Sequence, residues 1–170
     1  MPAPSAPLIE RVRRNHALEH ATLHMLEETS PRLRAGGRAS TGGFYLFGDL
    51  PDEGTVVIAA NKAIRRMGGG ERDLAVHPRC GTNVVTAGVL GGALAMLGVL
   101  VSGKRAPWYV QLPNAILGAL VGGLLSVRVG PWMQAIVTTS ADVQTAKVRG
   151  IRKGEFAGMT SHFVETMHGE

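Results

Sequence analysis

Three side chains between residues 16 and 20 have the types and the spacing of a metal-binding site. His16, Glu19 and His20 form the pattern H-x-x-E-H, which presents two metal ligands and a proton acceptor from one helical turn. A helix turns by about 100° per residue, so the two histidines lie about 40° apart on one face. Two imidazoles so placed can bind one zinc ion, and Glu19 can accept a proton from a water molecule. His24 extends the same face by another turn.

A second candidate cluster has the sequence H-P-R-C-G-T-N at residues 77–83. A loop of this kind can present an imidazole, His77, and a thiolate, Cys80, to one ion. Taken alone, the pair also fits a small buried cysteine and a polar residue at the end of a strand. Combined with the helix histidines, the loop supplies third and fourth ligands. We therefore predict a zinc site of His16, His20, His77 and Cys80 with Glu19 as catalytic base, and leave open which of the two loop residues is a ligand.

The elements that must position these groups predict an α+β fold. Residues 8–28 carry a wide apolar face and end before Pro31, which is typical of a buried helix with the histidines in its middle. A short aromatic strand, a helix with an acidic start and a basic end, and a second short strand follow. These three elements are expected at 44–47, 52–67 and 74–77. The basic, glycine-rich residues 32–42 match no phosphate-binding pattern and are expected to be a connector.

Two uncharged stretches follow, at 84–101 and 108–127. Each is close to the ~20 residues that a helix needs to cross a bilayer, and a domain this small could not cover two such apolar helices. Both contain a pair of glycines at the four-residue spacing that lets membrane helices touch closely. The pairs are Gly88 with Gly92 and Gly118 with Gly122. We predict a transmembrane hairpin, with the lipid bilayer as a partner and homo-oligomers forming through its glycine-rich helices.

The distribution of charge predicts the orientation of the hairpin. The chain has a net charge of +5, and most positive residues near the hairpin lie on the side of the termini, with only Lys104 and Arg105 in its loop. The positive-inside rule then places both termini and the metal-site domain in the cytoplasm. Residues 1–7 have no signal-peptide pattern and are expected to be a disordered lead. Basic and aromatic residues do not alternate along the chain, so we expect no nucleic-acid partner.

The C-terminal part of the chain predicts two more strands. Residues 146–152 alternate with basic residues on one face, and 161–166 can form their hairpin partner. We expect both to return to the sheet begun by the earlier strands. His162 and His168 could be spare ligands, but we expect them to be exposed residues of the tail. The predicted architecture is a small αβαβ zinc-binding domain interrupted by a two-helix transmembrane hairpin. Its parts are a lead (1–7), the metal-site domain (8–83), the hairpin (84–130) and a C-terminal β segment packing on the metal-site domain (131–170).

The paired motifs, followed by an apolar glycine-rich stretch, resemble a group of uncharacterised bacterial membrane proteins classed only as a domain of unknown function. The related YqhQ-like membrane proteins carry a similar pair. This resemblance covers roughly residues 10–130 and implies the bacterial inner membrane, but no activity. H-x-x-E-H is also similar to the motif of the inverted-motif zinc peptidases, which implies that Glu19 is the base. Those peptidases take a downstream glutamate as third ligand, where this chain has His77 or Cys80 instead.

These observations lead to two main hypotheses for function. The first is a membrane-anchored zinc-dependent hydrolase, foremost a peptidase, with water at an open position of the metal. A peptide or protein substrate would then pair with strand 44–47 as an added strand. The second is a non-catalytic adaptor or assembly factor in which all four ligands close a structural zinc site and Glu19 orients a ligand. A membrane subunit that binds no metal is a third possibility.

Overall fold

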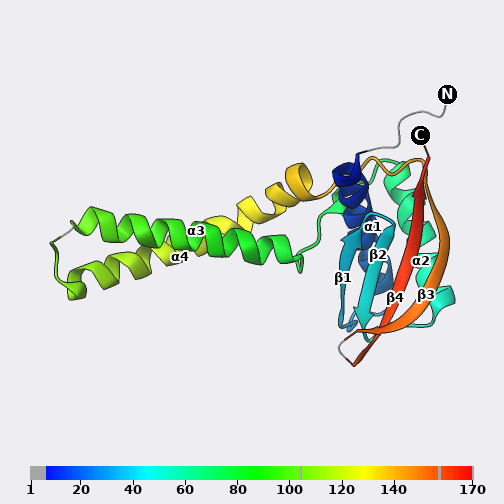
Figure 1. Cartoon of the computed structure of the whole chain (residues 1–170), viewed down its shortest axis with the longest axis horizontal. Helices are drawn as coiled ribbons and strands as arrows, with labels where there is room; N and C mark the ends of the chain where they lie inside the picture. The colour runs from blue at the N-terminus through cyan, green and yellow to red at the C-terminus, as the bar shows by residue number, and fades with distance from the viewer. Residues whose placement is uncertain (1–6, 104, 157, 170) are drawn as a thin grey trace. The chain divides into compact units, whose positions relative to one another are not determined.

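A computed structural model describes residues 7–103, 105–156 and 158–169 of the chain. The chain forms two compact units (Figure 1). The first comprises Met1–His77 and Ala135–Glu170, and the second comprises Pro78–Gln134. The predicted disordered lead lies outside the described residues except for Pro7, and so does Lys104 of the predicted loop.

The first unit is an α+β domain with a four-stranded antiparallel sheet in the order β1-β2-β4-β3. Its elements are α1 (Leu8–Thr29), β1 (Ala35–Ser40), β2 (Gly43–Gly48), α2 (Glu53–Gly68), the 3₁₀-helix η1 (Arg72–Ala75), β3 (Ala146–Phe156) and β4 (Met159–His168). β4 pairs with β2, with Phe44 opposite Val164 and Phe47 opposite Ser161. The C-terminal strands therefore return to the N-terminal sheet, as the sequence predicts.

The order of elements departs from the predicted αβαβ arrangement at two places. Residues 32–42, expected to be a connector, contain the edge strand β1, in which Gly37 lies opposite Leu46 of β2. Strand pairing uses backbone N–H and C=O groups, so a glycine-rich strand leaves no alternating side-chain pattern in the sequence. Residues 74–77, expected to be a strand, contain the end of η1 and a segment that joins no described sheet. A run of three apolar residues does not specify a strand without a pairing partner.

Helices α1 and α2 cover one face of this sheet (Figure 1). Side chains alternate along β2, so that Phe44 and Leu46 are buried in the core beneath the helices. Tyr45 lies on the opposite face and is exposed. Asp52 caps α2 by accepting a hydrogen bond from the backbone N–H of Thr55 at 3.1 Å. This packing fixes α1, the helix that carries the histidines, against the sheet.

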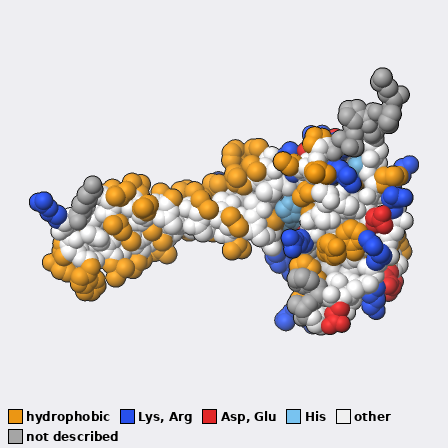
Figure 2. Space-filling model, in the orientation of Figure 1, with side chains coloured by type: hydrophobic (Ala, Val, Ile, Leu, Met, Phe, Trp, Pro, Cys, Tyr) orange, Lys and Arg blue, Asp and Glu red, His pale blue; other side chains and the backbone are white. Residues whose placement is uncertain are grey.

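The second unit is a hairpin of the helices α3 (Gly81–Ser102) and α4 (Trp108–Met133), and a π-helical turn follows at Gln134–Thr138. Two helices are long and apolar enough to cross a membrane, by length and composition. No residue of α3 is buried, and hydrophobic side chains cover much of the hairpin surface in Figure 2. Soluble domains do not usually expose apolar surface of this extent.

Of the two glycine pairs expected to bring the helices of the hairpin into contact, only the pair on α4 does so. At Gly118 of α4 an added Cβ would lie 2.1 Å from the carbonyl oxygen of Leu94, and at Gly122 it would lie 2.5 Å from another carbonyl of α3. The predicted pair on α3 takes no part in this contact. At Gly88 and Gly92 an added Cβ would meet no described atom within 4 Å.

Candidate metal centre

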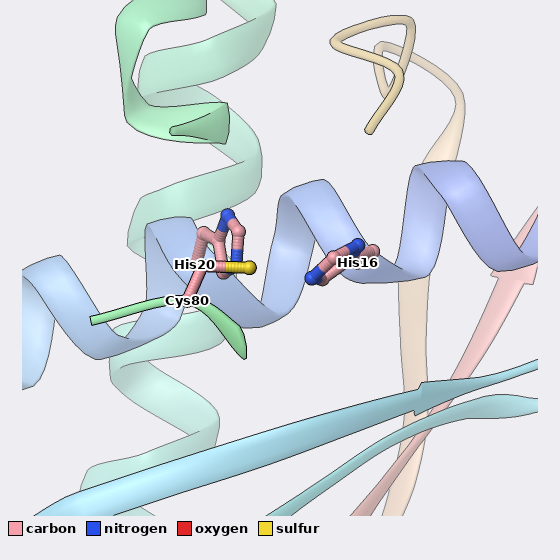
Figure 3. A group of neighbouring side chains, drawn as sticks. All are labelled: His16, His20 and Cys80. Atoms are coloured by element: carbon pink, nitrogen blue, oxygen red, sulfur yellow. The ribbon is translucent and has the colours of Figure 1, made fainter. Parts of the chain in front are cut away.

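The histidines of α1 lie on successive turns of one face, as their spacing predicts. The ring centroids of His16 and His20 are 4.3 Å apart, and the rings meet edge to face. Figure 3 shows these two side chains on neighbouring turns of α1, and it also draws Cys80, which belongs to the second unit. The ring of His77 lies 5.7 Å from that of His20 and 4.7 Å from that of His24. Four imidazoles thus form a row within the first unit.

Hydrogen bonds to main-chain carbonyls fix the tautomers of His16 and His20. The Nδ1 atom of His16 donates to the carbonyl of Thr138 at 2.9 Å, and that of His20 donates to the carbonyl of Ala75 at 2.7 Å. A carbonyl oxygen only accepts, so Nδ1 carries the proton and the lone pair of each neutral ring is on Nε2. Metal-ligating histidines are oriented in this way, by donating their other ring N–H to an acceptor.

Burial favours the neutral form that a metal ligand needs. Burial lowers the pKa of His16 and outweighs its hydrogen bond to the Thr138 carbonyl, which favours the protonated ring. His20 is 1% exposed. The potential ligand atoms of the two rings lie within 4.8 Å of each other. Neutral, oriented nitrogen donors at this spacing fit a divalent transition metal such as zinc.

His77 lies with two residues of α1 that the sequence analysis did not select as ligands. One ligand atom each from His24, Glu27 and His77 lies within 4.8 Å of the others. Nε2 of His77 is 3.2 Å from Oε1 of Glu27, and His77 is 2% exposed. Nε2 of His24 donates to the carbonyl of Val76 at 2.9 Å, so the lone pair of its neutral ring is on Nδ1. The first unit therefore contains a second group of potential ligands.

Cys80 caps the N-terminus of α3 in the second unit. Its Sγ accepts a hydrogen bond from the backbone N–H of Thr82 at 3.4 Å. The N-terminal end of a helix favours negative charge, so the position suits a thiolate. Because Cys80 follows His77 by only three residues, their Cα atoms are within about 11 Å of each other. Chain connectivity alone therefore limits the distance between Cys80 and His77.

The carboxylate of Glu19, the predicted base, faces the edge strand β1. An added Cβ at Gly37 would lie 2.5 Å from Cγ and Oε1 of Glu19. Only a residue without a side chain leaves room for this carboxylate, which is buried with Glu19 4% exposed. Around the helix axis, Glu19 lies about 60° from His16. The carboxylate therefore occupies the side of the histidine face that turns toward β1.

Asn15 joins α1 to two strands directly before the first histidine. Its Nδ2 donates to the carbonyl of Ser40 at 2.7 Å, and its Oδ1 accepts from Thr166 Oγ1 at 2.6 Å and from His168 Nε2 at 2.7 Å. Buried networks of this kind fix the position of an element. His168 is partly buried and His162 is 2% exposed, so the expectation of exposed tail histidines was wrong. Both lie on the face of β4 that carries the buried Val164, because side chains on alternate residues of a strand share a face.

Helix α1 also holds both segments of the first unit that connect to the hairpin. Arg13 donates to the carbonyls of Ile136 and Thr139 at 2.8 and 2.9 Å, and His16 donates to the carbonyl of Thr138 between them. His20 and His24 bind the carbonyls of Ala75 and Val76. The histidine face is therefore bonded to the last residues before the hairpin and to the first residues after it.

The strand predicted to receive a substrate is closed on both sides. β2 pairs with β1 along one edge and with β4 along the other, so no further strand can add to residues 44–47. The sheet edge beside Glu19 is formed by β1 instead. A cavity of about 630 Å³ adjoins this strand, and its lining includes Arg38, Ser40 and Tyr45.

Glu27 and Gly37 are the candidate site residues that sequence reasoning missed. Helical spacing does contain a signal for Glu27, because it lies about 20° around the axis from His16, on the face of the three histidines. No local pattern marks Gly37. Its importance arises only where β1 packs against α1 and meets Glu19.

Fold and site together define an α+β domain with a histidine-rich helix, joined to a helical hairpin with the length and composition of a membrane segment. The chain belongs to the family described as Domain of unknown function (DUF6391), whose profile matches residues 11–151. It is 34% identical over 167 residues to an uncharacterized protein of Picosynechococcus sp. (strain PCC 7002), a match that covers 90% of this chain and 78% of that protein. No solved structure matches the chain.

Proposed function

We propose that the protein is a membrane-anchored, zinc-dependent hydrolase that acts on peptides. The observation that carries this proposal is the orientation of His16 and His20. Both are bound through Nδ1 to carbonyl oxygens, so that their lone pairs are on Nε2. A buried carboxylate, Glu19, lies on the adjoining side of the same helix. Two imidazoles with oriented tautomers and a neighbouring carboxylate match the donor set of hydrolytic zinc sites.

Each residue would have a distinct role. His16 and His20 would hold the ion, and Cys80, kept near by the chain, would be the third protein ligand. When bound, zinc would polarise a water molecule and lower its pKa toward neutrality. Glu19 would accept the proton of that water, because packing against Gly37 gives its carboxylate a fixed direction.

The edge of β1 would hold the substrate. An extended peptide can pair its backbone with an edge strand, while pockets beside the strand receive alternate side chains. β1 lies beside Glu19 and adjoins the cavity of about 630 Å³. A bound peptide would then run past the proposed base with its carbonyl groups held in register.

The hairpin would anchor this centre at a membrane surface. The excess of positive residues on the terminal side supports a cytoplasmic location for the first unit, on the bacterial inner membrane. Gly88 and Gly92, where an added Cβ would meet no described atom within 4 Å, would offer a surface for homo-oligomers in the bilayer.

Replacement of the base tests the catalytic role. The full chain in lipid nanodiscs with zinc should cleave members of an internally quenched peptide library. Glu19→Gln should lower this rate by about 100-fold or more while zinc content is retained, because the proton acceptor is lost and the ligands are not. Glu53→Gln, which changes a carboxylate on α2, should cleave like the wild type. An unchanged rate in Glu19→Gln, or no cleavage by the wild type, would contradict the proposal.

A non-catalytic metal site is the second candidate function, and one observation favours it. The α1 histidines bind the segments on both sides of the hairpin, so an ion held by them would fasten these connections. A closed site of His16, His20, His77 and Cys80 would then make the protein an adaptor or assembly factor. In that case chelation should lower the melting temperature strongly, and Glu19→Gln should leave the phenotype unaltered.

A further inference from the structure

We propose that His24, Glu27 and His77 form a second divalent-metal site, separate from His16 and His20. All three residues belong to the first unit. The proposal concerns metal binding alone, so it does not depend on hydrolase activity. Two imidazoles and one carboxylate are a ligand set that proteins use for zinc and for iron(II).

The spacing of the ligand atoms supports this site. Two ligands each about 2.0–2.1 Å from a tetrahedral ion lie about 3.3–3.4 Å apart. Nε2 of His77 donates a hydrogen bond to Oε1 of Glu27 at 3.2 Å, which is close to this separation, and a bound ion would replace the shared proton. The third member, His24, has a ligand atom within 4.8 Å of those of the other two. The group therefore needs only small side-chain movements to close around one ion.

The orientation of His24 points to the same conclusion. Its Nε2 donates to the carbonyl of Val76, the residue next to His77, so the lone pair of the neutral ring is on Nδ1. The second group thus repeats the arrangement at His16 and His20, in which a carbonyl holds the ring and determines which nitrogen can bind a metal. Glu27 adds the negative charge that partly balances a divalent ion.

His77 is buried among the imidazoles of α1. His77 is 2% exposed, and its ring lies within 6 Å of two other imidazoles. An ion here would also fix His77, the last residue of the first unit before the hairpin.

Metal stoichiometry tests the second site directly. The full chain in detergent micelles, freed of metal with a chelator, would be dialysed against zinc and analysed by inductively coupled plasma mass spectrometry. We expect two equivalents per chain. Glu27→Gln and His24→Ala should each reduce the content to one equivalent. Glu28→Gln is the matched control, because this neighbouring carboxylate pairs with Lys62 and Arg66 instead, and it should keep both equivalents.

The two proposed sites give different results in this experiment. His16→Ala should also lose one equivalent, and the double variant His16→Ala/Glu27→Gln should lose both. If the wild type binds one equivalent that Glu27→Gln removes and His16→Ala keeps, only the second site exists and the proposed hydrolase centre fails. If Glu27→Gln and His24→Ala keep the full wild-type content, the second site is overturned. Circular dichroism spectra must show that each variant retains the helical content of the wild type.

Discussion

Main-chain carbonyls determine what the histidines of α1 can do. His16 and His20 each donate Nδ1–H to a carbonyl, whereas His24 donates Nε2–H. The same side chain therefore presents a different nitrogen on different turns, although the sequence spacing is regular. This difference arises from the packing of α1 against residues 75–76 and 138, and it divides the histidine row into two groups.

Gly37 permits a buried carboxylate at the centre, so Gly37→Ala should displace Glu19. The added Cβ would lie 2.5 Å from Oε1 of Glu19, and overpacking of this kind costs about 1–3 kcal/mol. We expect a lower melting temperature and, if Glu19 is the base, a loss of peptide cleavage. Gly42→Ala is the matched control, since its Cβ would meet only Phe163, at 3.9 Å. Equal melting temperatures for the two variants would show that Glu19 does not need the space at Gly37.

The buried histidine His162 makes stability depend on pH. Burial lowers its pKa below the ordinary 6.5, outweighing the acidic influence of Glu53. Below pH 6.5 the unfolded chain therefore binds more protons than the folded chain, and stability falls as the pH drops from there toward the folded pKa. His162→Leu removes this titration. The difference in melting temperature, variant minus wild type, should thus be more positive at pH 5.5 than at pH 8. An equal difference at both pH values would show that His162 does not cause the pH dependence.

At the scale of elements, the pairing of α1 with β1 creates the candidate centre. α1 supplies the histidines and the carboxylate, and β1 supplies a surface without side chains against which Glu19 can lie. β1 is also an edge strand, so its outer backbone groups can pair with an extended chain. The strand that carries the aromatic residues, β2, is a central strand and contributes Phe44 and Leu46 to the core.

Helix contact in the hairpin should depend on the glycines of α4. Gly118→Ala places a Cβ 2.1 Å from a backbone carbonyl, which cannot move as a side chain can, so we expect a destabilisation of about 1–3 kcal/mol or more. Gly92→Ala, on a surface with no described atom within 4 Å, should change stability by less than about 0.5 kcal/mol. Thermal unfolding in micelles, followed by circular dichroism, measures both. A larger effect at Gly92 would show that α3 makes contacts outside the chain.

At the scale of the whole molecule, the hairpin is inserted into the sequence of the first unit. The chain leaves that unit after His77 and re-enters it at Ala135, and α1 bonds to the segments at both points. Ions in the two proposed sites would therefore bind close to the two points where the chain leaves and re-enters the first unit. Such an arrangement would link metal binding to the anchoring of the hairpin.

The proposed orientation can be checked by labelling a cysteine in the hairpin loop. Arg105→Cys should react with a membrane-impermeant maleimide in intact cells, because the loop is expected outside the cytoplasm. Arg149→Cys on β3 should react only after the membrane is permeabilised, and the native Cys80 provides the background for both. Labelling of position 149 but not 105 in intact cells would invert the proposed topology.

The sequence by itself determined the elements whose side chains carry a periodic pattern. The helical spacing of His16, Glu19 and His20 and the two apolar stretches depend on local residue order alone, so helix α1 and the hairpin could be predicted. Alternation likewise indicated the C-terminal strands, since the pattern of a half-buried strand is local as well. For the same reason, helical spacing alone could have revealed Glu27.

Tertiary structure alone decided the partners of these elements. Backbone pairing and packing between separate segments decide three features, which a glycine-rich sequence does not predict. They are the strand β1, the internal position of β2 and the place of Gly37 against Glu19. The grouping of His77 with His24 and Glu27 depends on how residues 75–77 cross α1. Residue types fix which atoms can bind a metal, whereas the fold fixes which of them meet, because metal binding requires several side chains at one point in space.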